Sequence, residues 1–207
     1  MKILKAKSTF FFAMLASAMT LGSLQFTSTA AAFYKIFDQV DYSEDRKSLS
    51  SFNKIYIAPI KTDLPETQRI HSRFKNRIDR GVSERDQQEQ AENLRKTLAR
   101  SLGKKYELVG EEGPSILTLE TTITRLESTR PTFQDLSSRP NLSLGSLYSG
   151  GAAVTINFRE NGSTLAVISD DYQSNFGDGS PRTGIWSDAN LAFNLWARQV
   201  SRFIKNN

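Results

Sequence analysis

The sequence contains no cysteine and a single histidine. Without cysteine, disulfides, thiolate metal sites, a cysteine nucleophile and lipid attachment through an N-terminal cysteine are all excluded. The histidine, His71, lies in "RIHSRFKNRID", and no serine stands in the G-x-S-x-G pattern of a nucleophile elbow. Catalysis by His71 would need a carboxylate and a nucleophile supplied by the fold. We therefore expect His71 to be a solvated side chain and predict no catalytic residue.

The sequence has only one long apolar run, from Phe10 to Leu24. Three lysines and no acidic residue precede it: Lys2, Lys5 and Lys7. This order is typical of a signal peptide, and the run is shorter than the roughly 20 residues that a spanning helix needs. Small residues follow, so cleavage is expected after Ala30 or Ala32. We predict that residues 1–32 are a cleaved signal peptide and that no transmembrane span remains; an uncleaved N-terminal anchor is the alternative.

Much of the apparent basicity belongs to this segment. The formal charge of the whole chain is +5, and removing residues 1–32 leaves 24 Lys and Arg against 22 Asp and Glu. The expected strands carry Thr and Glu on their polar faces, where a nucleic-acid-binding sheet would carry basic and aromatic side chains. We expect no nucleic-acid partner. The remaining 175 residues have the length of one ordinary domain.

The chain after the signal peptide is expected to contain an irregular lead-in, 33–51, and a single α+β domain, 52–207. "NKIYIAPI" predicts the first strand. "SERDQQEQAENLRKTLARSLG" predicts a helix that Ser83 caps, with Gly103 as a left-handed C-cap. The apolar residues of this helix recur at spacings of three and four: Ala91, Leu94, Leu98 and Leu102. A second helix is expected from Ser187, with Ser187 as its N-cap, in "WSDANLAFNLWARQVSRFIK".

Two further segments predict strands. In "SILTLETTITRLESTRP" the residues alternate, which places Leu117, Leu119 and Ile123 on one face and mostly polar residues on the other. In "GAAVTINFRENGSTLAVISDDY", Asn161-Gly162 is a hairpin turn signal. The expected pairs are Glu160 with Ser163, Phe158 with Leu165, Ile156 with Val167 and Val154 with Ser169. The order of elements predicts an α+β fold, with a mainly antiparallel sheet and two principal helices packed on one face.

A basic segment lies between the first strand and the first helix. Its cations are Arg69, Arg73, Lys75, Arg77 and Arg80, and apolar residues stand among them at spacings of four: Ile70, Phe74 and Ile78. If helical, the segment would present a cationic surface to anionic lipid, lipopolysaccharide phosphate or an acidic partner. The alternative is a solvated connecting helix that docks on the domain. We treat these cations as a candidate patch for an anionic partner.

Acidic residues gather late in the chain: Asp170, Asp171, Asp178 and Asp188. A calcium loop of the EF-hand type counted from Asp171 fails, because Phe176 stands where the turn glycine is needed and Arg182 where the bidentate glutamate is needed. An irregular oxygen-rich site and ordinary turn or cap residues are the remaining interpretations. We predict no metal site and no cofactor.

The sequence resembles the family of bacterial lipoproteins known as domain of unknown function 3313. The resemblance rests on "FNKIYIAPI", on "QQEQAENLRKTLARSLGKKYELVGEEGPSILTLETTITRLESTRP", on "AAVTINFRENGSTLAVISDD" and on "WSDANLAFNLWARQVSRFI". It implies a protein of the Gram-negative cell envelope, and it implies no activity, cofactor or site. Members of the family usually carry a lipobox cysteine, which this chain lacks. We therefore expect an exported protein, periplasmic or secreted, that is not lipid-anchored.

Three hypotheses for function follow. The first is a non-enzymatic binding or accessory module of the envelope, which binds another envelope protein or an anionic envelope polymer through its open sheet face or its basic segment. The second is a glycan or cell-wall hydrolase that uses carboxylates not marked by any motif. The third is a structural surface protein with neither turnover nor a discrete partner.

Overall fold

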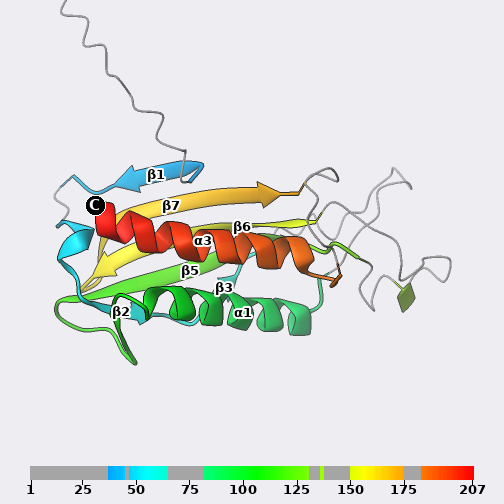
Figure 1. Cartoon of the computed structure of the whole chain (residues 1–207), viewed down its shortest axis with the longest axis horizontal. Helices are drawn as coiled ribbons and strands as arrows, with labels where there is room; N and C mark the ends of the chain where they lie inside the picture. The colour runs from blue at the N-terminus through cyan, green and yellow to red at the C-terminus, as the bar shows by residue number, and fades with distance from the viewer. Residues whose placement is uncertain (1–36, 45–46, 65–81, 131–135, 138–149, 175–182) are drawn as a thin grey trace, which may run out of the picture. The chain divides into compact units, whose positions relative to one another are not determined.

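The computed structural model describes residues 37–44, 47–64, 82–130, 136–137, 150–174 and 183–207. Seven strands, one 3-10 turn and two long helices form from them (Figure 1). In chain order these are β1 (Gln39–Tyr42), η1 (Leu49–Ser51), β2 (Lys54–Ile57), β3 (Lys61–Thr62), α1 (Glu84–Leu102), β4 (Glu107–Val109), β5 (Ile116–Glu127), β6 (Gly151–Glu160), β7 (Ser163–Gln173) and α3 (Ser187–Asn206).

All seven strands belong to one mixed sheet. Its order is β1-β7-β6-β5-β2-β4, and β3 also pairs with β5. The pairs β1–β7, β7–β6 and β6–β5 are antiparallel, whereas β2 is parallel to both β5 and β4, and β3 is parallel to β5. The prediction of an α+β fold is confirmed, but "mainly antiparallel" is only partly right, because the sheet is mixed: its three longest strands, β5, β6 and β7, pair antiparallel, while β2, β3 and β4 join it in parallel. The reason is the crossover: the chain leaves β2, passes through α1 and returns in β4, which makes the two strands parallel.

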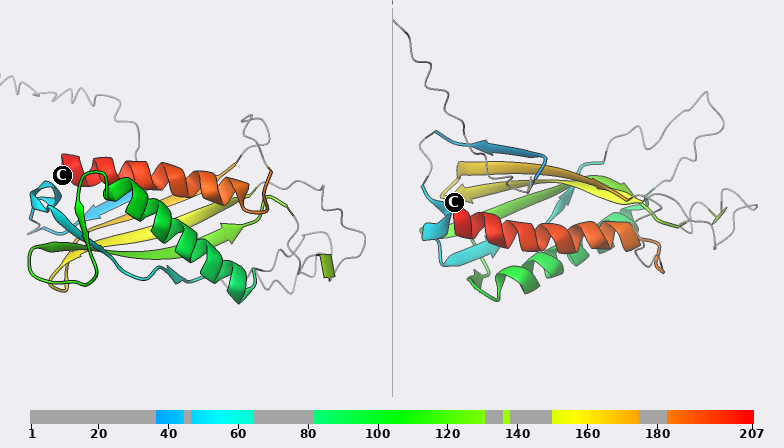
Figure 2. Two further views of the ribbon diagram at one scale, coloured as in Figure 1. Left: turned by 60° about the horizontal axis from the view of Figure 1, so that its bottom comes forward. Right: turned by 45° about the horizontal axis from the view of Figure 1, so that its top comes forward.

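Both helices lie on the same face of the sheet, side by side and running in the same direction (Figures 1 and 2). Two hydrogen bonds join them: Asn93 Nδ2 donates to Asn190 Oδ1 at 2.6 Å, and Ser101 Oγ donates to the carbonyl of Ala197 at 2.8 Å. The core fills the space between this helix layer and the sheet. As the spacing predicts, the stripe of α1 is buried there, and Leu94 is fully buried.

The ends of the helices confirm one of three capping predictions. Ser83 Oγ accepts a hydrogen bond from the backbone N–H of Asp86 at 3.1 Å, so it caps α1 as expected. Gly103 is not left-handed: its φ and ψ are −62° and −8°, and its N–H still donates to the carbonyl of Ala99. Ser187 is the first residue of α3 and not its cap, because its hydroxyl donates to the carbonyl of Gly184 and accepts from that residue's N–H.

The alternation expected in β5 is confirmed. Leu117, Leu119 and Ile123 are fully buried beneath the helices, and Thr121 on the same face is 1% exposed. The opposite face carries Thr and charged residues. A register shift between Ile123 and Arg125 then keeps Leu126 in the core.

The β6–β7 hairpin turns at Asn161 and Gly162, both with positive φ, and Glu160 faces Ser163 as predicted. Arg159 then faces Thr164, but from Phe158 onward the predicted register is wrong by one residue. The observed pairs are Phe158 with Ala166, Ile156 with Ile168 and Val154 with Asp170. A bulge in β7 causes the shift: Leu165 is the extra residue, and both it and the adjacent Ala166 are buried.

The range expected to be an irregular lead-in, 33–51, contains regular structure where it is described. Strand β1 pairs with β7 at one edge of the sheet, and η1 follows. Phe37, Leu49 and Phe52 insert into the core and are at most 3% exposed. This part of the chain therefore belongs to the folded unit. The predicted signal peptide, 1–32, lies outside the described residues and stays a prediction.

Candidate functional site

The side of the sheet opposite the helices is not covered by any element that the structure describes (Figure 2). We call it the open face. Because side chains alternate along a strand, the register of β2, β5, β6 and β7 decides which residues lie there. They include Tyr56, Ile116, Thr118, Glu120, Thr122, Arg125, Glu127, Ala153, Thr155, Asn157, Arg159, Val167, Ser169 and Asp171. Most of them are hydroxyl, amide or charged side chains.

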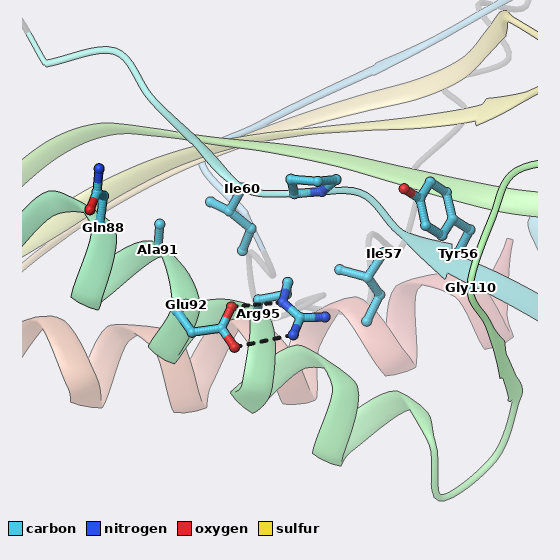
Figure 3. A pocket seen from close by; sticks show the side chains of 9 residues that line it. Tyr56, Ile57, Ile60, Gln88, Ala91, Glu92, Arg95 and Gly110 are labelled. Carbon is cyan, nitrogen blue, oxygen red and sulfur yellow. Dashed lines mark hydrogen bonds and ion pairs between the residues drawn. The ribbon is translucent and has the colours of Figure 1, made fainter.

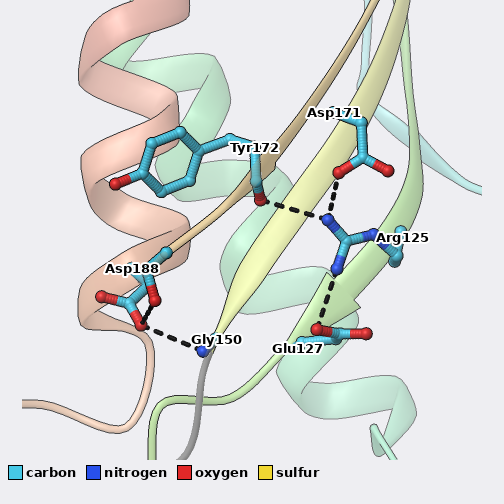
Figure 4. Close-up of polar contacts among 7 residues, drawn as sticks. Arg125, Glu127, Gly150, Asp171, Tyr172 and Asp188 are labelled. Atoms are coloured by element: carbon cyan, nitrogen blue, oxygen red, sulfur yellow. Dashed lines mark hydrogen bonds and ion pairs between the residues drawn. The ribbon is translucent and has the colours of Figure 1, made fainter. Parts of the chain in front are cut away.

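Arg125 gathers partners from two strands at one end of this face (Figure 4). Its Nη1 lies 2.8 Å from Glu127 Oε2, and its Nη2 donates to Asp171 Oδ1 and, at 3.1 Å, to the carbonyl of Tyr172. Burial of Arg125 opposes its charge, but the hydrogen bond to Asp171 and the charges of both carboxylates outweigh burial, so the pKa of Arg125 is raised. The guanidinium is therefore a fixed, charged junction between β5 and β7.

Arg159 forms the second charged group of the open face. Its Nη1 lies 2.5 Å from Glu120 Oε1, and its Nη2 donates to the carbonyl of Gly162 at 2.6 Å. Next to it along β6, Asn157 has a buried Oδ1, and neither this oxygen nor Arg159 Nε has a hydrogen-bond partner within the described part of the chain. Buried polar atoms are normally satisfied, so these two are exceptions among the polar groups of the open face.

The carboxylates of the open face are held by arginines. Glu127 and Asp171 share Arg125, and Glu120 contacts Arg159. Each of these carboxylates therefore already has a charged hydrogen-bond donor within the sheet.

The acidic residues that the sequence places close together are separated in the structure. Asp171 is on the open face, while Asp170 points to the helix side and accepts from Trp196 Nε1 at 2.5 Å and from the backbone N–H of Asp38 at 3.0 Å. Burial raises the pKa of Asp170, although these two hydrogen bonds lower it. Asp188 is 1% exposed, and its Oδ2 accepts from the N–H of Gly150 at 3.0 Å (Figure 4).

Asp178, the fourth of these residues, lies outside the described residues. Within the described ranges, no group of three or more His, Asp or Glu side chains is arranged to hold a metal ion. The candidate patch Arg69, Arg73, Lys75, Arg77 and Arg80, together with His71, falls in 65–81, which is also outside them. The anionic-partner prediction for that segment stays a prediction.

A shallow groove of about 480 Å³ lies between β2 and the first half of α1 (Figure 3). Ile57, Ile60 and Ala91 give it an apolar floor. At its rim Arg95 makes two hydrogen bonds to Glu92, at 2.8 and 3.1 Å, and the hydrogen bond from Arg95 lowers the pKa of that carboxyl. The two charges satisfy each other, so the rim presents no uncompensated charge to a ligand.

Sequence reasoning missed Arg125 and Arg159 as members of the site. Both lie at positions of β5 and β6 where the alternation of the sequence predicts an outward, polar side chain, and this alternation is the signal that could have identified them. It could not have supplied their partners, because Asp171 lies 46 residues from Arg125, and the bulges in β5 and β7 decide which strand positions face each other.

Gly151, the first residue of β6, lies so close to β7 and to Arg125 that a side chain does not fit there. Its replacement by alanine is expected to lower the free energy of unfolding by about 2 kcal/mol. An added Cβ would lie 2.3 Å from the carbonyl oxygen of Tyr172 and 3.3 Å from Arg125 Nη2. Gly110→Ala is the matched control, since its Cβ would have no heavy atom within 4 Å. Urea unfolding of both variants checks this, and equal midpoints would contradict it.

The architecture is that of an α+β domain in which one mixed sheet carries two parallel helices on a single face. Residues 37–200 match the model of the family described as "Protein of unknown function (DUF3313)". The chain belongs to this family, as the resemblance predicted. The comparison with curated proteins found no match.

Solved structures with a similar fold include the PelC dodecamer from Paraburkholderia phytofirmans, with 9% identity and a TM-score of 0.39 over 78% of this chain and 97% of that one. A point variant of the same PelC dodecamer gives 12% identity and a TM-score of 0.40 over 82% of this chain and 98% of that one. At such values, no function is carried over from PelC. In the described part of the chain, neither helix combines the length and apolarity needed to cross a membrane.

Proposed function

We propose that this protein is an exported, non-enzymatic binding or accessory module of the cell envelope and that the open face is where it binds its partner. The observation that carries the proposal is the open face itself, a sheet surface of hydroxyl, amide and charged side chains that no described helix covers. Membership of the family supplies no activity.

The chemistry of the face defines the kind of partner. Its hydroxyl and amide groups, which include the Thr155–Ser169 pair at 3.1 Å, can donate to or accept from a polar surface. Its arginines already hold Glu120, Glu127 and Asp171, so they are not available to neutralise an additional anion without losing these contacts. A protein surface or a hydroxyl-rich polymer fits this face better than a densely charged one.

Site-specific crosslinking in living cells tests the proposal. A photoreactive amino acid at Val167, a half-buried residue of β7 that faces Asn157 on the open face, is expected to give a discrete crosslinked product. The same amino acid at the exposed Asn194 of α3, on the helix side, is the control and is expected not to give that product. Arg159→Glu, combined with the photoreactive amino acid at Val167, should abolish the product. The substitution replaces the cation that contacts Glu120 by a second carboxylate, and the two like charges repel each other on the open face.

Two outcomes would overturn the proposal. Turnover of peptidoglycan or a polysaccharide by the pure protein, abolished by one Asp or Glu substitution, would establish the hydrolase instead. The absence of any crosslinked product from the open face, with folded and exported protein, would favour a structural surface protein.

A further inference from the structure

In the C-terminal halves of α1 and α3, every charged side chain is basic. Between Asn93 and Tyr106 the chain has no acidic residue, and between Ala189 and Asn207 it again has none. Both stretches contain basic residues that the structure shows as exposed: Arg100, Lys104, Lys105, Arg198, Arg202 and Lys205. We call these six residues the helix-layer patch.

The packing of the helices brings the two stretches together. The hydrogen bond from Ser101 to the carbonyl of Ala197 fixes α1 beside α3, and Arg100 and Arg198 are the residues adjacent to this contact. The helices are parallel, so their C-terminal ends lie at the same end of the layer (Figure 2). Arg198, Arg202 and Lys205 follow each other at spacings of four and three, which places them on one side of α3.

These cations are not neutralised within the described part of the chain. Its ion pairs include Arg95 and Lys96 with Glu92, but none of them involves a member of the helix-layer patch. Compensation of the helix dipole explains one cation in the last turn of each helix, Arg100 and Lys205. It does not explain Arg198, which lies two turns before the end of α3, or Lys104 and Lys105 beyond α1.

We propose that the helix-layer patch docks the protein on an anionic phospholipid surface. All six cations are exposed, and they lie on two adjacent helices and on the turn that follows α1. A stereospecific phosphate site would be concave, with a converging, bidentate arginine. A plane of flexible basic side chains matches a surface on which many phosphate groups can move, and each lysine or arginine near such a surface adds to the binding.

This docking would also orient the molecule. The helix layer and the open face lie on opposite sides of the sheet, so a protein bound through the helix-layer patch directs the open face away from the lipid. The inference does not depend on the function proposed for the open face, because the two surfaces share no residue.

Vesicle co-sedimentation of the exported protein, isolated from cells, tests the inference. Vesicles of phosphatidylcholine alone are compared with vesicles that also contain phosphatidylglycerol, at low salt and at about 0.5 M salt. The expected result is binding to the anionic vesicles alone, reversed by salt. Because each cation contributes roughly fivefold, Arg198→Gln with Arg202→Gln and Lys205→Gln should weaken binding on the order of 100-fold.

The matched control replaces three exposed cations outside the helix-layer patch, as Lys54→Gln with Lys61→Gln and Arg85→Gln. It changes the net charge equally and should leave binding within a few-fold of the wild type. Circular dichroism verifies that both variants are folded. Equal losses in both triple variants, equal binding to the two kinds of vesicle, or binding to soluble polyphosphate but not to vesicles would each overturn the inference.

Discussion

Replacement of Asp188 by alanine is expected to lower the free energy of unfolding by about 3 kcal/mol. The carboxylate is 1% exposed, and its Oδ2 accepts from the N–H of Gly150 at 3.0 Å and from Ser174 Oγ at 2.6 Å. Its own N–H donates to Thr129 Oγ1 at 3.1 Å. Alanine keeps the backbone contact but leaves two buried donors without their acceptor. Because these donors belong to the ends of β6 and β7, the loss loosens the junction between the sheet and α3.

Two variants separate this effect from a general loss of charge. Asp188→Asn retains one side-chain oxygen in the same place, so it should lose less stability than Asp188→Ala. Asp41→Ala removes an exposed aspartate whose side chain accepts a hydrogen bond from the exposed Gln39, and the expected change is within about 0.5 kcal/mol. Urea unfolding monitored by tryptophan fluorescence gives the three values. If Asp188→Ala unfolds at the same midpoint as Asp41→Ala, the junction does not have this role.

The helices and the inner face of the sheet could be predicted from the sequence because they follow from periodicity. The spacing of Leu94, Leu98 and Leu102 and the alternation of Leu117, Leu119 and Ile123 each report the burial of one face, and burial stabilises these elements. Features that depend on non-local contacts were less accessible. β1 has four residues without an apolar alternation, and it forms because β7 offers it an edge.

The direction of β2 and β4 illustrates a different limit. A strand, a helix and a strand in succession already imply a parallel pair in one sheet. The hairpin signal at Asn161 and Gly162 is strong, but it predicts the direction of β6 and β7 only and says nothing of the other strand pairs. The bulge at Leu165 was hidden for a related reason: a turn motif fixes the first pairs of a hairpin, whereas burial of two consecutive apolar residues decides the pairs beyond it.

For the polar surfaces too, the local pattern could be predicted from the sequence, whereas contacts between distant segments could not. That one face of β5 is polar could be read from alternation, but the contact of Arg125 with Asp171 depends on the order of strands β5, β6 and β7. The helix-layer patch depends on the packing of α1 against α3, which joins two stretches almost 100 residues apart. The basic segment between the first strand and the first helix is continuous in sequence, so it could be identified without knowledge of the fold.

Replacement of Trp196 by alanine is expected to destabilise the fold at least as much as Asp188→Ala, with a loss of about 3 to 5 kcal/mol in the free energy of unfolding. The side chain is 1% exposed and packs against Phe193, with ring centroids 5.8 Å apart. Its Nε1 also donates to Asp170 Oδ2 at 2.5 Å. Alanine therefore leaves a cavity between α3 and the sheet and removes a donor from a half-buried carboxylate.

Trp196→Phe isolates the hydrogen bond, because it keeps most of the apolar volume. Burial already raises the pKa of Asp170, and the bond from Trp196 lowers it, so the phenylalanine variant should raise this pKa further. A carboxyl with a raised pKa binds its proton more tightly in the folded state, so stability falls as the pH rises through that pKa. The loss caused by Trp196→Phe should therefore be larger near pH 7 than near pH 4. Urea unfolding at both pH values, followed by circular dichroism, measures it, and a loss that is independent of pH would show that the indole acts through packing alone.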